Sequence, residues 1–271
     1  MLKKSALTLA LLSGLSAAFA VQAVEPLRVA ADPVPHAQIL AYVQKIDPQL
    51  QLKIIEIPNG VNSNELLAHG DVDANYFQHL PYLQSQEQAL GQKFAVAATV
   101  HIEPLGIYSH RHKSFDQVPV KGTVAVPNNV TNLSRALYLL QDNGLIKLKP
   151  GFDDPARDQA TPKDIAQNPK QLKIIEIESP QIPRALDDVD LAVINGNYAL
   201  EAGLVPAKDA LGLEKAAHNP YANILVTIPK LVDDPRIKQL AKDLNSPQVA
   251  KFITENYSGS VIPVAVAGSQ P

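Results

Sequence analysis

The chain reads Leu52-Lys53-Ile54-Ile55-Glu56-Ile57 in its first half, and the same six residues return in its second half as Leu172-Lys173-Ile174-Ile175-Glu176-Ile177. Their apolar, β-branched character predicts a strand at both places. An Asp-Val-Asp follows each copy, at Asp71-Val72-Asp73 and at Asp188-Val189-Asp190. One good strand can arise twice by chance, but the shared flanking pattern favours a duplication. Two matching α/β halves predict two lobes, and clefts between lobes bind small ligands.

The N-terminal residues have the pattern of a secretory signal peptide. Two lysines precede an apolar stretch over residues 6–15, and the small-x-small sites Ala18-Phe19-Ala20 and Val21-Gln22-Ala23 follow. The apolar stretch is shorter than the roughly 20 residues of a transmembrane helix, so a membrane anchor is the weaker alternative. We therefore expect residues 1–23 to be removed and the mature protein to be exported.

Composition narrows the class of protein. The chain has no cysteine, which excludes disulfides and thiolate metal sites. Its net charge of −3 gives no indication of a basic surface for nucleic acid or for an anionic membrane. About 250 residues are left after export, which is enough for one large domain or for two lobes.

Strands and helices alternate through both halves, which predicts parallel sheets covered by helices on both faces. We interpret residues 94–109, which contain two extended apolar runs, as the first crossing between the lobes, and residues 220–226 as the return crossing. Residues 24–103 and 222–271 then form lobe 1, and residues 104–221 form lobe 2.

A polar, asparagine-rich loop joins a predicted strand to a helix in the second half. The loop contains Asn128 and ends near Thr131 or Asn132, either of which can cap the helix. Free N–H groups in the first turn of a helix favour an anion. Arg135, expected in that turn, can bind a carboxylate through two hydrogen bonds. A solvated arginine beside an ordinary cap is the alternative.

Three aromatic or imidazole side chains follow a strand of the first half. Phe77, His79 and Tyr82 gather at its carboxyl end, where ligands bind in α/β sheets. Phe77 and His79 point the same way if the segment is extended. Ordinary core packing is the alternative for such a cluster.

Two asparagines stand at related positions in the second half. Asn195 ends the matching strand, and Asn223 lies on the return crossing, where we expect it to face the cleft. An asparagine amide both donates and accepts hydrogen bonds, so it suits the carboxylate and the ammonium of an amino acid. Formation of a turn at Asn195-Gly196 is the alternative for the first of them.

The sequence allows two other interpretations, a metal-binding protein and an enzyme. His101, Glu103, His110 and His112 could supply metal ligands, although Arg111 and Lys113 would repel a cation. A solvated loop is the simpler interpretation, so we expect no metal and no cofactor. The sequence contains no nucleophile elbow and no glycine-rich phosphate loop, and no constellation indicates an enzyme.

Several stretches resemble the methionine-binding lipoproteins (NlpA type) of ABC importers, in order and over nearly the whole mature chain. They are residues 73–79 with Pro81-Tyr82-Leu83, Asn132 with Arg135-Ala136-Leu137, and residues 144–149, 183–188, 192–195 and 220–223. These motifs are typical of that family rather than of binding proteins at large.

The resemblance implies a two-lobed, periplasmic binding protein-like fold of type II that closes over a free amino acid. It implies that Arg135 and Asn223 hold the carboxylate and amino groups with help from Asn195, and that Phe77, His79 and Tyr82 line the side-chain end. A thioether against aromatic rings is a favourable contact. Closure would then present a surface to the permease.

The chain departs from the family in two respects. The family is usually anchored by a lipid on a cysteine, and this chain has none, so we expect a freely soluble periplasmic protein. The loops at residues 59–64 and 128–132 also lack the proline-containing patterns usual in the family. We therefore expect the grip on the amino-acid moiety to be intact and the side-chain pocket to differ from that of the family.

We therefore expect a monomeric periplasmic substrate-binding protein that delivers L- or D-methionine, or a related amino acid, to an ABC importer. The alternatives are another amino acid or a short methionine-containing peptide as ligand, a secreted metal-binding transport protein, and an unrecognised α/β enzyme.

Overall fold

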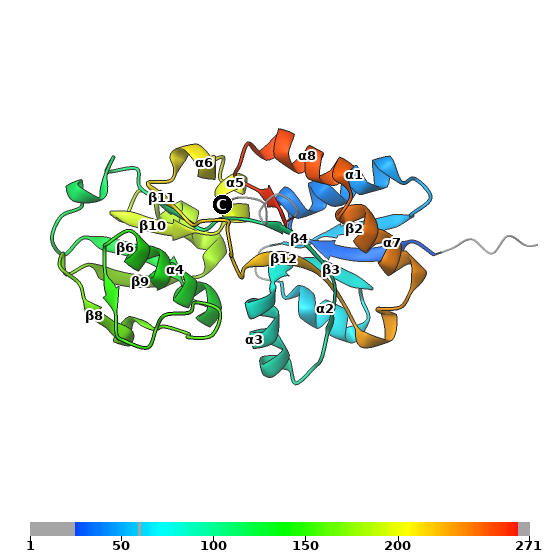
Figure 1. Cartoon of the computed structure of the whole chain (residues 1–271), viewed down its shortest axis with the longest axis horizontal. Helices are drawn as coiled ribbons and strands as arrows, with labels where there is room; N and C mark the ends of the chain where they lie inside the picture. The colour runs from blue at the N-terminus through cyan, green and yellow to red at the C-terminus, as the bar shows by residue number, and fades with distance from the viewer. Residues whose placement is uncertain (1–24, 59–60, 265–271) are drawn as a thin grey trace, which may run out of the picture.

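The computed structural model describes residues 25–58 and 61–264 of the chain. The expected signal peptide, residues 1–23, lies outside these residues. The described chain forms two lobes side by side, each built on one β-sheet (Figure 1). The prediction of a two-lobed α/β fold is confirmed.

The first sheet has the strand order β13-β4-β12-β3-β1-β2. Its strands are β1 (Leu27–Ala31), β2 (Leu52–Glu56), β3 (Ala74–His79), β4 (Ala95–Ile102), β12 (Ala222–Thr227) and β13 (Ile262–Pro263). The helices of this lobe are α1 (Gln38–Ile46), α2 (Ser63–His69), α3 (Leu80–Leu90), α7 (Pro235–Leu244) and α8 (Pro247–Tyr257). Side chains alternate along β1, so Val29 packs towards α1, α7 and α8, and Ala30 packs towards α2 and α3. Both faces of the sheet are therefore covered.

The second sheet has the order β11-β5-β10-β6-β9. Its strands are β5 (Gly106–Tyr108), β6 (Thr123–Pro127), β9 (Lys173–Ile177), β10 (Leu191–Ile194) and β11 (Gly212–Leu213). The other elements of this lobe are α4 (Val130–Asp142), β7 (Lys147–Leu148), β8 (Ile165–Gln167), the helical turn η4 (Ser179–Ala185), α5 (Gly196–Glu201) and α6 (Pro206–Asp209). Val124 packs with residues of α4, whereas Ala125 packs with residues of η4 and α5. This sheet also buries both faces.

The repeated hexapeptide occupies equivalent places in the two lobes. β2 and β9 are edge strands, and each pairs in parallel with the first strand of its half, β1 or β6. Ile54 lies opposite Val29, and Ile174 lies opposite Val124, so the register is the same. The strand orders β3-β1-β2 and β10-β6-β9 also correspond. Equal topology and register are what a duplicated unit produces.

The last aspartate of each Asp-Val-Asp fixes the start of the first strand of its unit. Asp73 Oδ2 accepts a hydrogen bond from the Arg28 N–H at 2.9 Å, and Asp190 Oδ2 accepts one from the Thr123 N–H at 2.7 Å. The Asp73 and Asp190 N–H groups donate back to the carbonyls of Arg28 and Thr123, at 2.8 and 3.1 Å. These two carboxylates therefore fix the starts of strands.

The expectation of purely parallel sheets is wrong for the strands at the crossings. β12 runs antiparallel to β3 and β4, and β5 runs antiparallel to β10. The chain leaves the first sheet after β4 and returns to it through β12, so the two crossing segments travel in opposite directions. Antiparallel pairing follows from that path.

Asn62 caps α2, since its Oδ1 accepts a hydrogen bond from the Asn64 N–H at 3.0 Å. Asn64 lies inside the helix and is buried, where its amide bonds to Gln78 at 2.9 Å.

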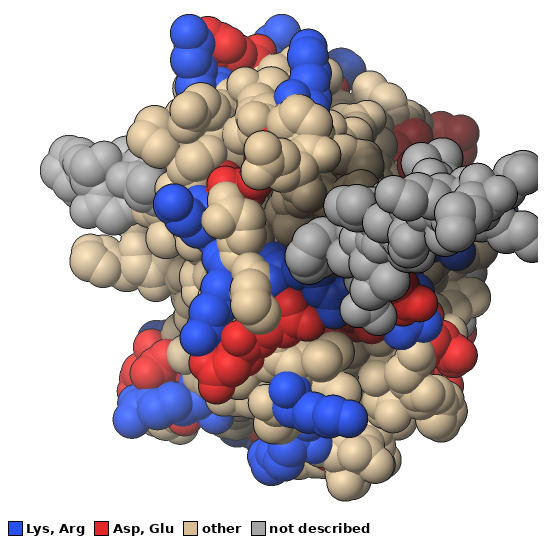
Figure 2. Space-filling view, turned by 90° about the vertical axis from the view of Figure 1, so that its right-hand side faces the viewer, with Lys and Arg blue, Asp and Glu red and all other residues tan. Residues whose placement is uncertain are grey.

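No helix among the described residues is long and apolar enough to cross a membrane. On the face of the first lobe in Figure 2, lysine and arginine side chains lie beside aspartates and glutamates. This mixture agrees with the small net charge of the chain, −3.

Candidate functional site

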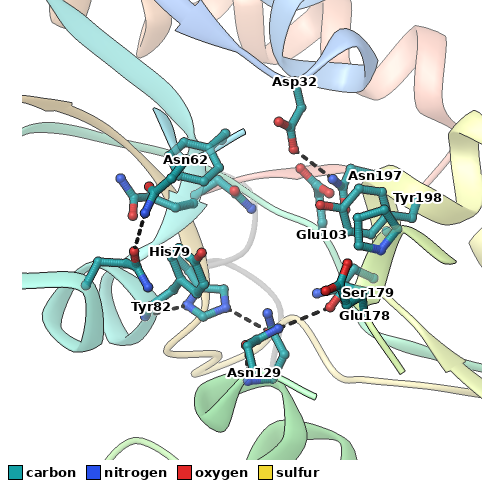
Figure 3. A pocket seen from close by; sticks show the side chains of 18 of the residues that line it. Asp32, Asn62, His79, Tyr82, Glu103, Asn129, Glu178, Ser179, Asn197 and Tyr198 are labelled. Carbon is teal, nitrogen blue, oxygen red and sulfur yellow. Dashed lines mark hydrogen bonds between the residues drawn. The ribbon is translucent and has the colours of Figure 1, made fainter. Parts of the chain in front are cut away.

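A cavity of about 360 Å³ lies between the two lobes (Figure 3). Small-molecule sites commonly enclose roughly 300–1,000 Å³. The structure brings all eight residues predicted for ligand binding to its walls, namely Phe77, His79, Tyr82, Asn128, Asn132, Arg135, Asn195 and Asn223.

The start of α4 differs from the prediction and changes the setting of Arg135. Asn129 caps the helix, because its backbone is extended and its Oδ1 accepts a hydrogen bond from the Asn132 N–H at 3.0 Å. The prediction of Thr131 or Asn132 as the cap is therefore wrong, since both lie inside the helix. Arg135 consequently lies in the second turn, so it does not share an anion site with the N–H groups of the first turn.

The Arg135 guanidinium is buried and already paired. Its Nε and Nη2 donate to the Glu214 carboxylate at 2.9 and 2.5 Å, and Nη2 also donates to the Glu103 carbonyl at 2.9 Å. The guanidinium carbon lies 4.3 Å from the centre of the Tyr221 ring, a cation–π contact. Nη1 makes no hydrogen bond to another described residue, and it is the group left to donate to a ligand.

His79 connects the two lobes across the cavity. Its Nε2–H donates to Asn132 Oδ1 at 3.0 Å, and its Nδ1 accepts from the Tyr82 N–H at 3.1 Å. One neutral tautomer satisfies both bonds. Burial, and secondly the charge of Arg135, lower the pKa of His79 to about 3. The imidazole is therefore uncharged at neutral pH.

Phe77 and Tyr82 form an aromatic wall on the same side as His79. Their ring centres are 6.0 Å apart with an interplanar angle of 82°, an edge-to-face pair. This wall provides an apolar, polarisable surface in a cavity whose other lining residues are largely polar.

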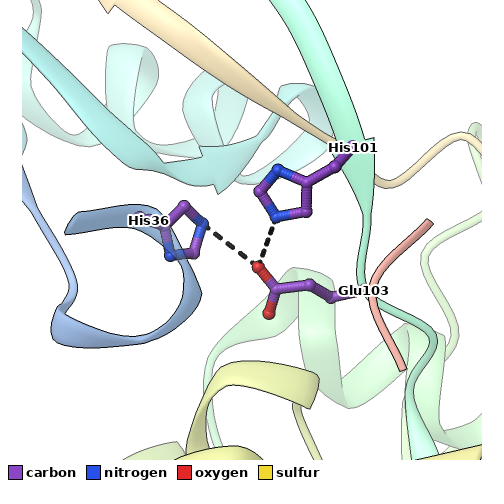
Figure 4. Close-up of side chains that lie close together, drawn as sticks. All are labelled: His36, His101 and Glu103. Atoms are coloured by element: carbon purple, nitrogen blue, oxygen red, sulfur yellow. Dashed lines mark hydrogen bonds and ion pairs between the residues drawn. The ribbon is translucent and has the colours of Figure 1, made fainter. Parts of the chain in front are cut away.

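A buried polar chain runs behind the cavity at the first crossing (Figure 4). Tyr76 donates its hydroxyl proton to His101 Nδ1, and His101 Nε2–H donates to Glu103 Oε1 at 2.7 Å. His36 Nε2 lies 3.1 Å from Glu103 Oε1 and 3.1 Å from Asn223 Oδ1, so its proton is shared between these acceptors.

The protonation of this chain follows from burial. Burial lowers the pKa of His36 to about 4 and that of His101 to about 3. Both imidazoles are neutral, and each donates its Nε2 proton towards the Glu103 carboxylate. Burial also raises the pKa of Glu103. Since Asn223 Oδ1 accepts from His36, its Nδ2 group is the one available to donate into the cavity.

Asp32 is a second carboxyl group in the cavity wall, and it is half-buried. It follows β1, and its Oδ2 accepts a hydrogen bond from Asn197 Nδ2 at 2.9 Å. This bond joins the first lobe to α5 of the second. Burial, and secondly the charge of Glu103, raise the pKa of Asp32 to about 8.

The four residues of the metal alternative are not assembled. His110 bonds to Asp187 and His112 bonds to Asp190, both on the second lobe. His101 and Glu103 instead meet His36, and ligand atoms of these three lie within 4.8 Å of one another. The hydrogen bonds described above account for this arrangement.

Sequence reasoning missed several residues of the wall, among them Asp32, Asn129 and Tyr198, and it missed Glu214 behind Arg135. Asp32 follows the carboxyl end of a strand, so the rule that led to Phe77 and His79 could have found it. Glu214 carries no such signal, because it lies in a loop far from Arg135 in the sequence.

Comparisons with known proteins show which proteins the chain resembles. A family model described as NlpA lipoprotein matches residues 27–265. The D-methionine-binding lipoprotein MetQ of Escherichia coli K12 is 39% identical over 228 residues, which cover 83% of this chain and 82% of that protein. A probable D-methionine-binding lipoprotein MetQ of Pasteurella multocida is 37% identical, with coverages of 83% and 80%.

A solved structure also resembles the chain. It is a nutrient binding protein from Burkholderia cenocepacia bound to methionine, with a TM-score of 0.83 and 44% identity. The match covers 88% of this chain and 99% of that one.

Proposed function

Because the chain belongs to the NlpA lipoprotein family, we propose that it is a periplasmic substrate-binding protein that captures methionine, or a related amino acid, for an ABC importer. The observation that carries this proposal is the cavity between the lobes, which contains an aromatic wall and a set of convergent polar groups.

The wall and the polar groups suit the two ends of methionine. Phe77 and Tyr82 offer aromatic rings to the thioether, a contact favoured by the polarisability of sulfur. Arg135 Nη1 and Asn223 Nδ2 are the donors for the ligand carboxylate. His79 and Asn132 bond directly across the two lobes. A ligand that contacts both lobes would favour this closed arrangement.

We assign residues 24–103 and 222–271 to lobe 1 and residues 104–221 to lobe 2; residues 24, 59–60 and 265–271 of this assignment lie outside the described residues. Supporting this division, β4 of the first sheet ends at Ile102, and β12 returns to that sheet at Ala222. The protein acts as a monomer, converts no substrate, and works in the periplasm without a cysteine-linked lipid. The lack of cysteine supports the last point.

Native mass spectrometry and calorimetry of the mature protein with a panel of amino acids, including both enantiomers of methionine, test the proposal. We expect selective one-to-one saturation by methionine and recovery of the ligand unchanged. Selective binding of another amino acid would revise the ligand and retain the transport role. Chemical conversion of the ligand, or saturation by a metal ion alone, would contradict the proposal.

A further inference from the structure

We propose that Asp32 and Glu103 form an anionic subsite for the ammonium group of the ligand, so that the cavity selects free amino acids over acids that lack the amine. This inference rests on the proposed function. It identifies the half of the cavity that recognises positive charge.

Asn197 holds the two carboxyl groups at one end of the cavity. Its side-chain Nδ2 donates to Asp32 Oδ2 at 2.9 Å, and its backbone N–H donates to the Glu103 carboxylate. Figure 3 shows Asp32, Glu103 and Asn197 together, on the far side of the cavity from Asn62. Both carboxyl groups line the cavity, and Glu103 is only 5% exposed.

The position of Glu103 is tightly constrained. A Cβ added at Gly196 would lie 2.8 Å from Glu103 Cβ and 3.2 Å from Glu103 Oε2. His36 and His101 hold the other oxygen, Oε1. The carboxylate is therefore fixed before a ligand arrives, which reduces the entropic cost of binding.

This end of the cavity lacks a cation of its own. Within the described ranges, no lysine or arginine forms an ion pair with Asp32 or Glu103, and the two histidines beside Glu103 are neutral. Arg135 is the nearby cation, but Glu214 pairs with its guanidinium. A buried carboxylate is costly unless it is paired, so a ligand ammonium would supply the missing charge.

A third acceptor in the same cavity points to the same ligand group. Asn195 Oδ1 is buried and has no hydrogen-bond partner among the described residues, although Asn195 lines the cavity. An unsatisfied buried acceptor is unfavourable without a ligand. An ammonium group has three N–H donors, which matches Asp32, Glu103 and Asn195 as acceptors.

Binding at this subsite couples to a proton on Asp32. The titratable groups around Asp32 are Glu103 on the crossing, Tyr82 on α3, and Tyr198 and Glu201 on α5. With a pKa of about 8, Asp32 is protonated in the free protein at pH 7. A bound ammonium favours the carboxylate, so binding releases the Asp32 proton to solvent. Affinity then rises with pH from 6 to 8, by up to about tenfold per pH unit.

The test compares L-methionine with 4-(methylthio)butanoic acid, which lacks the amine, and with 3-(methylthio)propylamine, which lacks the carboxylate. By calorimetry, we expect wild-type protein to prefer methionine over the butanoic acid by about 30-fold or more, the usual effect of removing one partner of a buried charge pair. Asp32→Asn keeps an acceptor for Asn197, and we expect it to weaken methionine and the propylamine but not the butanoic acid. It should also abolish proton release and the rise of affinity with pH.

Asp71→Asn is the matched control, because Asp71 is exposed in the same lobe and does not line the cavity. It should leave all three affinities unchanged. Equal wild-type affinities for methionine and the butanoic acid would overturn the subsite while leaving the proposed function intact. Equal weakening of all three ligands by Asp32→Asn would also overturn it, since Asp32 would then act only through its contact with Asn197. Failure of the wild-type protein to bind any amino acid would reject the proposed function and the subsite together.

Discussion

At the scale of single residues, the cavity offers separate hydrogen-bond donors and acceptors to a ligand. Asn223 and Asn132 use their side-chain oxygens to accept from His36 and His79, which leaves their amide N–H groups for a ligand. Asn195 has the reverse arrangement, with an oxygen that has no partner in the described chain. Donors and acceptors of this kind discriminate between the carboxylate and the ammonium of one small molecule.

Arg135 gives a prediction at this scale. Arg135→Ala should weaken methionine binding by about 2–5 kcal/mol, because the ligand carboxylate would be buried without its charged partner. The weakening should be much smaller for 3-(methylthio)propylamine, which has no carboxylate for Arg135 to bind. Isothermal titration with both ligands measures the difference, and circular dichroism checks that the variant is folded.

Arg184→Ala is the control for charge removal, since Arg184 is exposed on η4 and does not line the cavity. It should bind both ligands as the wild type does. If Arg135→Ala weakened both ligands by the same factor, Arg135 would be a structural partner of Glu214 and Tyr221 rather than a ligand contact.

At the scale of elements, the two lobes use one construction twice. Each has an edge strand with the repeated hexapeptide, paired in the same register with the first strand of its half. In each, an aspartate ahead of the third strand receives the N–H at the start of the first. This contact sets where the parallel strands begin, and therefore where their carboxyl ends meet the cavity.

The second Asp-Val-Asp motif allows a matched test of stability, because only its last aspartate bonds to the start of a strand. Asp190→Asn should lower the free energy of unfolding by about 1–3 kcal/mol, because charged hydrogen bonds to Thr123 and His112 are lost. Asp188→Asn, two residues away and exposed, should change it by no more than about 0.5 kcal/mol. Urea denaturation followed by circular dichroism measures both values. Equal effects from the two substitutions would contradict the role given to Asp190.

At the scale of the whole molecule, the buried titratable groups gather where the lobes meet. His36, His79 and His101 are neutral there, and Asp32 and Glu103 share the same region (Figures 3 and 4). Such groups link folding to pH, because the unfolded chain titrates each of them at its ordinary pKa.

We predict that stability is greatest near pH 6.5. Below that pH the three histidines are protonated in the unfolded chain but stay neutral in the fold, where their pKa values are about 3 to 4. Stability therefore decreases as the pH is lowered. The raised pKa values of Asp32 and Glu103 oppose this trend and make the decline shallower. From pH 6.5 to 8 the histidines of the unfolded chain lose their protons, so the raised pKa of Asp32 becomes the dominant contribution. Unfolding then releases the Asp32 proton, and stability falls as pH rises.

Each net proton corresponds to about 1.4 kcal/mol per pH unit. Urea denaturation from pH 4 to 8.5 tests the shape of the curve. Asp32→Asn should remove most of the decline above pH 6.5 and leave the acid side in place. A stability that rises steadily to pH 8 would contradict the raised pKa of Asp32.

Patterns along the chain were enough to predict the two-lobed α/β fold, the family and eight residues of the cavity wall. Strand pattern, turn residues and motifs are local, and a strand's carboxyl end is where an α/β sheet binds ligands. Phe77, His79 and Asn195 could therefore be located from their places along the chain alone.

The pairing of buried groups could be read only from the folded chain. Glu214 neutralises Arg135, and His36 joins His101 and Glu103, across separations in sequence that no local pattern encodes. The antiparallel strands at the crossings likewise follow from the path of the chain between two sheets. Burial and charge pairing are properties of the folded molecule, so the subsite of Asp32 and Glu103 could be identified only from the arrangement of the two lobes.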